Sequence, residues 1–186
     1  MAPTRLQTLA EVEAALWHEL LRAPRDKHHE WRTPVLATRD GESADARSVV
    51  LREVDQSSRS LRVFTDSRSP KVAQMGAHPQ GTVVMWSSRL SWQLRLRVLM
   101  QVETDGLALA SRWARLKLSP GAQDYLSPLA PGSVLDGSSA AVSVVHDRGH
   151  FALVTLLVQS IDWLELHAEG HRRASFDATG ARWLAP

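Results

Sequence analysis

The chain opens with apolar residues that recur at helical spacing. Four of them share one face: Leu9, Val12, Leu16 and Leu20. Thr8 and Glu11 have the spacing of a capping box, in which each residue caps the other's free backbone N–H. Pro24 cannot continue a helix. The pattern predicts a helix over residues 8–23 and a polar connector over 24–33.

Apolar and polar residues then alternate, as in strands with one buried face. Along residues 92–102, Trp92 and Leu94 share one face, while Gln93 and Arg95 lie on the other. Asp40-Gly41 is a turn signal followed by a polar loop, and residues 55–59 form a hairpin loop. Strands are predicted over residues 35–38, 47–53, 61–65, 82–86 and 92–102.

Two helices interrupt this series. Ser69-Pro70-Lys71 is a helix start, with Ser69 as N-cap and Pro70 at the first helical position, and His78-Pro79 ends that helix. A second helix is expected over about residues 106–118, capped by Asp105. Its predicted inward residues are Leu107, Ala110, Trp113 and Leu116. Residues 119–140, rich in Pro, Gly and Ser, predict an ordered loop with one helical turn.

The last third returns to strands, over residues 151–158, 161–166, 171–176 and 182–184. Many short strands with few helices predict an α+β domain whose strands close into a barrel. A chain of 186 residues has the length of one domain, so residues 1–186 are expected to form a single domain.

Composition removes several classes of function. The chain has no Cys, which excludes disulfides, Cys-ligated metal and thiol catalysis, and a cytoplasmic location is expected. The eight His are scattered without metal-ligand spacing, so no metal site is expected. No apolar run reaches the ~18 residues of a membrane span, and the N-terminus lacks the apolar core of a signal peptide. A net charge of +2 argues against nucleic acid as a partner.

Three groups of residues are candidates for chemistry. Arg47, Ser69 and Lys71 would combine two cations with a helix start, which suits a phosphate; alternatively both cations are solvated surface residues. Gln93 could hydrogen-bond the edge of a polar ring, unless its strand simply faces water. Trp163 with residues 170–173 could hold a flat anion, unless the latter are a solvated turn. No Gly-x-Ser-x-Gly, Walker or dinucleotide-binding glycine motif occurs.

In order, these pieces resemble the pyridoxamine 5'-phosphate oxidase-like family of FMN-binding split barrels, closest to its uncharacterised FMN-binding subgroup. The resemblance covers about residues 32–186. It rests on Ala46-Arg47-Ser48-Val49-Val50-Leu51-Arg52, Phe64-Thr65-Asp66-Ser67-Arg68-Ser69-Pro70-Lys71, His78-Pro79, Leu90-Ser91-Trp92-Gln93, Trp163, His171-Arg172-Arg173 and Leu184-Ala185-Pro186.

The resemblance implies a mainly antiparallel, six-stranded split β-barrel with flanking helices. It also implies a homodimer with two FMN sites at its interface. By correspondence with the family, the cofactor-binding residues would be Arg47, Ser48, Val49, Val50, Thr65, Ser69, Lys71, Gln93, Trp163 and Arg173. In this assignment Arg47 and Lys71 hold the phosphate, Gln93 meets the ring edge, and Trp163 and Arg173 reach the flavin across the dimer.

The substrate side departs from the vitamin-pathway oxidase. Arg52 is compatible with holding a substrate phosphate, and His171 and Arg172 are further candidates for the substrate site. Glu169 stands where the oxidase has a second arginine, and residues 112–135 show no clear counterpart of its substrate-phosphate loop. The resemblance therefore favours FMN binding over turnover of pyridoxamine 5'-phosphate.

The expected function is an FMN-dependent oxidoreductase that moves a hydride from a small organic substrate to flavin N5. The chemistry would be the cofactor's, and no catalytic residue of the protein is assigned. Two alternatives stay open at this point. One is a flavin carrier or sensor without turnover, and the other is an anion- or nucleic-acid-binding module that uses the arginine-rich strands.

Overall fold

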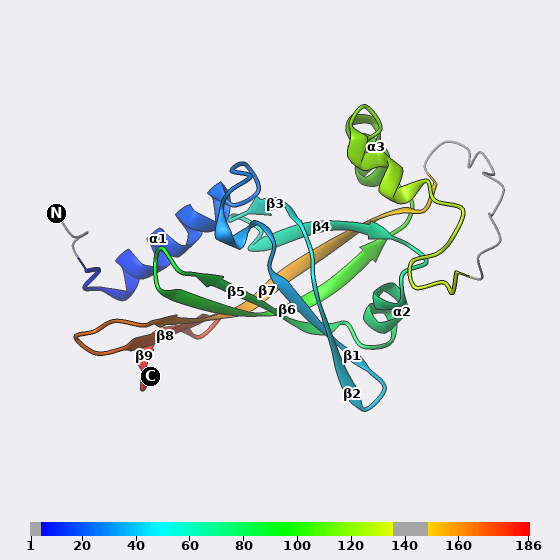
Figure 1. The fold of residues 1–186 in the computed structure, drawn as a ribbon. Coiled ribbons are helices and arrows are strands. Elements are labelled where there is room, and N and C mark those ends of the chain that lie inside the picture. Colours follow the sequence, from blue (N-terminus) through cyan, green and yellow to red (C-terminus); the bar gives the residue numbers. More distant parts are fainter. Residues whose placement is uncertain (1–4, 136–148) are drawn as a thin grey trace.

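The computed structural model describes residues 5–135 and 149–186, which form a curled antiparallel sheet with helices packed around it (Figure 1). Within these residues the sheet has nine strands, in the order β2-β1-β5-β6-β7-β4-β3, with β8 and then β9 joined to β7. The strands are β1 (Val35–Asp40), β2 (Ser43–Ser48), β3 (Leu51–Asp55), β4 (Ser60–Asp66), β5 (Gln80–Ser87), β6 (Trp92–Glu103), β7 (Phe151–Glu165), β8 (Arg172–Asp177) and β9 (Gly180–Leu184). The helices are α1 (Leu9–Arg22), α2 (Pro70–Ala77) and α3 (Leu107–Leu116), with 3-10 turns η1 (Glu30–Arg32) and η2 (Pro120–Tyr125). The α+β class is confirmed.

Strand β7 joins the two parts of the sheet. It pairs with β6 along most of its length, with β4 through its first half and with β8 through its last residues. The sequence pattern predicted two strands here. Instead one strand of 15 residues runs through, because a bulge opposite Arg97 and Val98 absorbs the extra residue Gln159.

The main core lies on the inner face of the sheet under α1. The predicted alternation on β6 is confirmed, since Trp92, Leu94, Leu96 and Val98 are buried there. The capping box of Thr8 and Glu11 is also present. A second, smaller cluster packs α3 and η2 against β4 and β7, through Leu109, Trp113, Tyr125 and Phe151. None of the helices described is long and apolar enough to span a membrane.

The region predicted as one strand over residues 47–53 is instead divided. Strand β2 begins at Ser43, so the predicted polar loop is mostly strand, and it forms a tight hairpin with β1 around Gly41. Gly41 has a φ of +58°, which glycine adopts without strain. The chain then leaves strand pairing between Ser48 and Leu51, where the Val49 N–H bonds the Pro34 carbonyl oxygen. The residues of β2 are mostly exposed and polar, so the strand shows no alternation of apolar and polar positions in the sequence.

Helix α3 differs from the prediction at its start. Gly106, not Asp105, is the N-cap, and no side chain caps this helix. Leu107 is 87% exposed, while Leu109 is fully buried. The inward face therefore runs through Leu109 and Trp113, about half a turn from the predicted start. The predicted helical turn within 119–140 is confirmed by η2, and residues 136–140 lie outside the described residues.

A glycine allows β1 and β5 to approach beside β6. A Cβ added at Gly81 would lie 2.9 Å from the Met100 sulfur and 3.0 Å from the Ala37 carbonyl oxygen. The second of these atoms belongs to the backbone and cannot rotate away. Gly76, in α2, has no atom within 4 Å of its added Cβ.

We therefore expect Gly81→Ala to lower the free energy of unfolding by about 1–3 kcal/mol, because the new methyl group overpacks the sheet. Gly76→Ala is the matched control. It should raise the free energy of unfolding by about 0.4–1 kcal/mol, because alanine lowers the conformational entropy of the unfolded chain. Urea denaturation followed by circular dichroism measures both. Equal effects of the two substitutions would contradict the close approach at Gly81.

Candidate functional site

The start of α2 holds a cation without an acidic partner. Lys71, in the first turn, is half-buried, and its Nζ donates hydrogen bonds to Thr65 Oγ1 at 3.2 Å and to Ser69 Oγ at 2.5 Å. Both hydroxyl residues are almost fully buried. Ser69 is the N-cap as predicted, but its hydroxyl bonds no backbone N–H of the helix because it receives Lys71.

Arg47 lies beside this lysine and links three elements. It stands opposite Leu36 in the β1–β2 register, and its guanidinium donates to Thr38 Oγ1 at 2.6 Å on β1. It also bonds Gln74 Oε1 at 2.9 Å on α2 and pairs with the carboxylate of Asp45 on β2. The guanidinium is thus held in place by strand and helix together.

The two cations influence each other. Burial lowers the pKa of Lys71 below its ordinary value, and the charge of Arg47 lowers it further, while Asp66 and Asp45 act in the opposite direction. Within residues 5–135 and 149–186, no carboxylate lies within 4.0 Å of the ammonium group. A half-buried cation next to another cation is stabilised by an added anion. This end of the site is suited to a phosphate.

The structure therefore brings together the predicted residues Arg47, Thr65, Ser69 and Lys71. The segment from Ser48 to Val50 connects β2 to β3 directly after Arg47, and Val49 is almost fully buried. Asp45, Thr38 and Gln74 were not predicted. Asp45 lay in a segment that was read as a loop, whereas Thr38 and Gln74 lay in a predicted strand and a predicted helix with no local signal for this role.

A second group of predicted residues lies on the outer face of the sheet. Trp86, Gln93, Leu164, Arg173 and Leu184 are paired in one cross-strand row from β5 to β9. Gln93 is half-buried, and its amide makes no hydrogen bond in the described part of the chain. An amide of this kind is free to bond the edge of a polar ring.

Arg173 in that row is already paired. Its Nε and Nη2 bond the two oxygens of Asp162 at 3.1 and 2.7 Å, and Arg95 bonds the same carboxylate at 2.6 Å. Burial alone would raise the pKa of Asp162, but the hydrogen bonds from Arg173 and Arg95 hold it below its ordinary value. The outer face thus carries two guanidiniums on one carboxylate, which leaves it positive.

Trp163 lies in a different place from Arg173. Its side chain is fully buried on the inner face, 5.4 Å from the ring of Trp92, and its Nε1 has no partner in the described residues. Arg172 stacks over this ring and over Trp183, at 5.8 and 5.7 Å. His171 is exposed. Within a single protomer, no part of the Trp163 side chain is exposed to make the predicted contact with the cofactor.

The two groups are far apart within one chain. Helix α2, with Lys71, and the β8–β9 hairpin, with Arg173, lie at opposite ends of the molecule (Figure 1). One small ligand cannot bridge them inside one protomer. Arg173 can share a ligand with Lys71 only if the two belong to different copies of the chain.

Arg52 lies apart from both groups, in the lining of a pocket of about 300 Å³ between α3 and the strands β3 and β4. Its guanidinium lies 5.7 Å from the centre of the Phe64 ring, and its Nε is buried without a partner in the described residues. Arg112 and Arg115 also line the pocket, with Glu53 and Ser119. Arg112 bonds both oxygens of Glu53, at 2.8 and 2.6 Å.

Sequence reasoning missed Arg115 and Ser119. Residues 112–135 showed no clear substrate-phosphate loop, yet both residues lie beside Arg52 in this pocket. No local signal in the sequence marked them, because the packing of α3 against distant strands brings them to Arg52. Three guanidiniums against one carboxylate suit a small anion.

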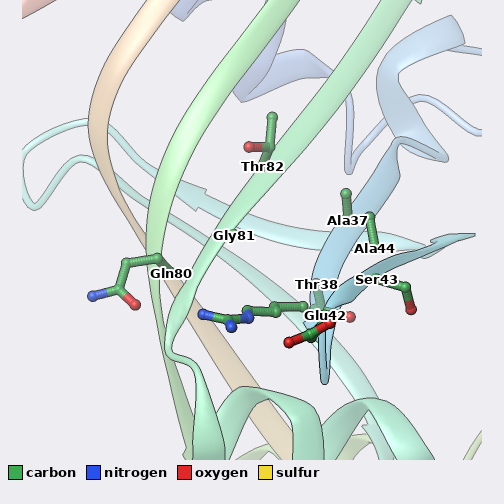
Figure 2. Close-up of a pocket in the computed structure, with 9 residues that line it drawn as sticks. Ala37, Thr38, Glu42, Ser43, Ala44, Gln80, Gly81 and Thr82 are labelled. Carbon is green, nitrogen blue, oxygen red and sulfur yellow. The ribbon is translucent and has the colours of Figure 1, made fainter.

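An open groove of about 590 Å³ lies on the β1–β2 hairpin and β5 (Figure 2). Small residues, among them Ala37, Ala44 and Gly81, form its floor. It contains none of the predicted site residues, although Thr38, which binds Arg47, lies along it. Its size reflects short side chains and is no sign of a ligand. Among the described residues, no group of three His, Asp or Glu could hold a metal ion.

Comparison with known proteins agrees with this geometry. Residues 14–103 match the family model described as pyridoxamine 5'-phosphate oxidase, FMN-binding domain. No curated protein sequence matches the chain. FMN is the cofactor of the matched domain, as predicted.

Solved structures show the same fold. A pyridoxamine 5'-phosphate oxidase-related, FMN-binding protein from Nostoc punctiforme is 21% identical, with a TM-score of 0.72 over 97% of this chain and 100% of its own. PhzG from Burkholderia lata, in complex with tetrahydrophenazine-1-carboxylic acid, is 13% identical, with a TM-score of 0.72 over 94% and 91%. Residues 14–103 are therefore identified as a pyridoxamine 5'-phosphate oxidase FMN-binding domain, and the chain has the fold of these FMN-binding proteins.

Proposed function

We propose that the phosphate of FMN binds Lys71 and Arg47 at the start of α2. The observation that supports this most directly is the ammonium of Lys71, which is half-buried beside a guanidinium and, within the described residues, bonded only to hydroxyls. A phosphate supplies the missing negative charge and accepts hydrogen bonds from both cations. Thr65 and Ser69 orient the lysine for that contact.

Lys71→Met removes the charge and leaves an unbranched side chain that is one atom shorter. Because a charge-assisted hydrogen bond is worth about 1.5–3 kcal/mol, we expect the dissociation constant of FMN to rise by about 10- to 150-fold. Quenching of flavin fluorescence on titration with apo-protein measures it. Lys117→Met, at an exposed lysine after α3, is the control and should bind FMN normally. Equal affinities of the two variants would exclude the assignment.

The protein acts as a homodimer in this proposal, with the outer face of the sheet as the interface. This face carries Trp86, which is 46% exposed, with Val35 and Leu184 also exposed. Covering these side chains removes apolar surface from water. The same contact brings Arg173 and Gln93 of one copy toward Lys71 of the other, which one protomer cannot do. Two FMN sites follow from the twofold symmetry.

Trp86→Asp places a charge on this face in place of an exposed apolar side chain. We expect the variant to become monomeric at micromolar concentration and to lose bound FMN, because a stable interface of over ~2,000 Å² would bury the charge. Light scattering combined with flavin absorbance measures both properties. Leu107→Asp, at another exposed apolar residue, should stay dimeric. A Trp86→Asp dimer with FMN bound would contradict the interface.

The reaction we propose is oxidation of a small anionic substrate held in the pocket of Arg52 and Arg115. Bound FMN supplies the redox chemistry as the acceptor of a hydride. The protein binds the anion through the guanidiniums, and Phe64 offers an apolar ring beside Arg52. The position of Arg52 beside Arg115 in the lining of one pocket supports this role.

Anaerobic bleaching of the flavin tests this reaction. Three reduced anions serve as probes: pyridoxamine 5'-phosphate, tetrahydrophenazine-1-carboxylic acid and NADPH. We expect one of them to bleach the flavin. Arg115→Ala should raise the concentration required by about 10-fold or more, through loss of one charge-assisted contact. Arg25→Ala, at an exposed arginine after α1, is the control.

The second candidate function is a flavin carrier or sensor without turnover. Failure of all three probes to bleach a protein that binds FMN would favour it. If Arg115→Ala requires no higher concentration of the probe for bleaching than the native protein, the substrate binds outside the pocket of Arg52 and Arg115.

A further inference from the structure

Lys71 differs from the two other lysines of the chain, Lys27 and Lys117. Those two are exposed, whereas Lys71 is half-buried next to a guanidinium. The sequence contains no further lysine. Each molecule therefore carries two internal references against which the chemistry of Lys71 can be compared.

The surroundings of Lys71 favour a reactive amine. An amine attacks a carbonyl carbon only in its neutral form, and burial together with Arg47 shifts Lys71 toward that form. Its contacts are the oxygens of Thr65 and Ser69, to which a neutral amine can donate both of its N–H groups. The lone pair then stays free for attack.

The neighbouring groups select the electrophile. A ligand whose phosphate lies at Arg47 and Ser69 places the atoms next to its phosphorus close to the amine. In an acyl phosphate, the carbonyl carbon is separated from phosphorus by one oxygen. We propose that small acyl phosphates acylate Lys71 in the FMN-free protein and that this modification blocks FMN binding. The inference rests on the proposed phosphate site.

The step needs no oxidant, reductant or metal. The nitrogen of Lys71 forms a bond to the carbonyl carbon, and the bond from that carbon to the phosphate oxygen breaks. Inorganic phosphate leaves with the electron pair of the broken bond, and the amine proton passes to phosphate or water. The product is a neutral amide at Lys71.

The modification removes the charge that the cofactor phosphate would use. Arg47 remains, but it is paired with Asp45. The acylated protein should then bind FMN as weakly as Lys71→Met does. Acyl phosphates would thus set the fraction of protein able to take up cofactor.

Acetyl phosphate and the FMN-free protein provide the test. Peptide mass spectrometry gives the acetylation rate of each lysine. We expect Lys71 to react at least 10-fold faster than Lys27 and Lys117, with a rate that saturates in acetyl phosphate and falls when inorganic phosphate or FMN is added. Equal rates at the three lysines, or a Lys71 rate unaffected by inorganic phosphate, would overturn the proposal.

A reagent without phosphate separates recognition from intrinsic reactivity. The N-hydroxysuccinimide ester of acetic acid should show no comparable preference for Lys71 in the same native protein. Equal preference with both reagents would mean that phosphate plays no part, and the proposal would fail. Arg47→Gln should slow acetylation of Lys71 by acetyl phosphate about 10-fold and leave Lys27 and Lys117 unchanged.

The acetylation experiment and the FMN-binding experiment test the two proposals separately. Selective, phosphate-sensitive acetylation in a protein that does not bind FMN would support the anion site and overturn FMN as its ligand. Normal FMN binding through Lys71 without selective acetylation would overturn only the present inference.

Discussion

The balance of charge at Lys71 is the constraint on which the site depends. Burying part of an ammonium group is unfavourable unless a negative group compensates it. The described residues supply hydroxyls but no carboxylate at contact distance. The fold can hold this arrangement because α2 is fixed against β1 by Gln74 and Arg47. The rigid strand and helix network, rather than a loop, positions the charges.

The second constraint is the distance between the two groups of predicted residues. Both groups sit on regular elements, so neither can move to the other. The long strands β6 and β7 set that separation. A site that uses both groups must be assembled from two chains, and cofactor binding then depends on subunit association.

Local signals in the sequence gave the parts of the structure that depend on short-range chemistry. The capping box at Thr8, the Ser69-Pro70 helix start and the alternation along β6 were all recovered. The polar strand β2 was missed because its exposed face carries no apolar period. Leu107 was misassigned because helix phase depends on packing against Phe151, far along the chain. The cluster around Arg52 and Arg115 depends on the same long-range packing, so spacing alone could not show it.

The pair of Arg47 and Asp45 has a consequence for cofactor exchange. The carboxylate of Asp45 pairs with the guanidinium of Arg47 and also accepts a hydrogen bond from Gln74. If the cofactor phosphate binds Arg47 as proposed, it competes with this carboxylate, so association is an exchange of one anion for another at the guanidinium. Uptake should therefore be slower than diffusion allows and should weaken little with ionic strength, because salt screens the outgoing and the incoming anion alike. The β1–β2 hairpin, which carries Asp45, would thus control the rate at which the protein binds its cofactor.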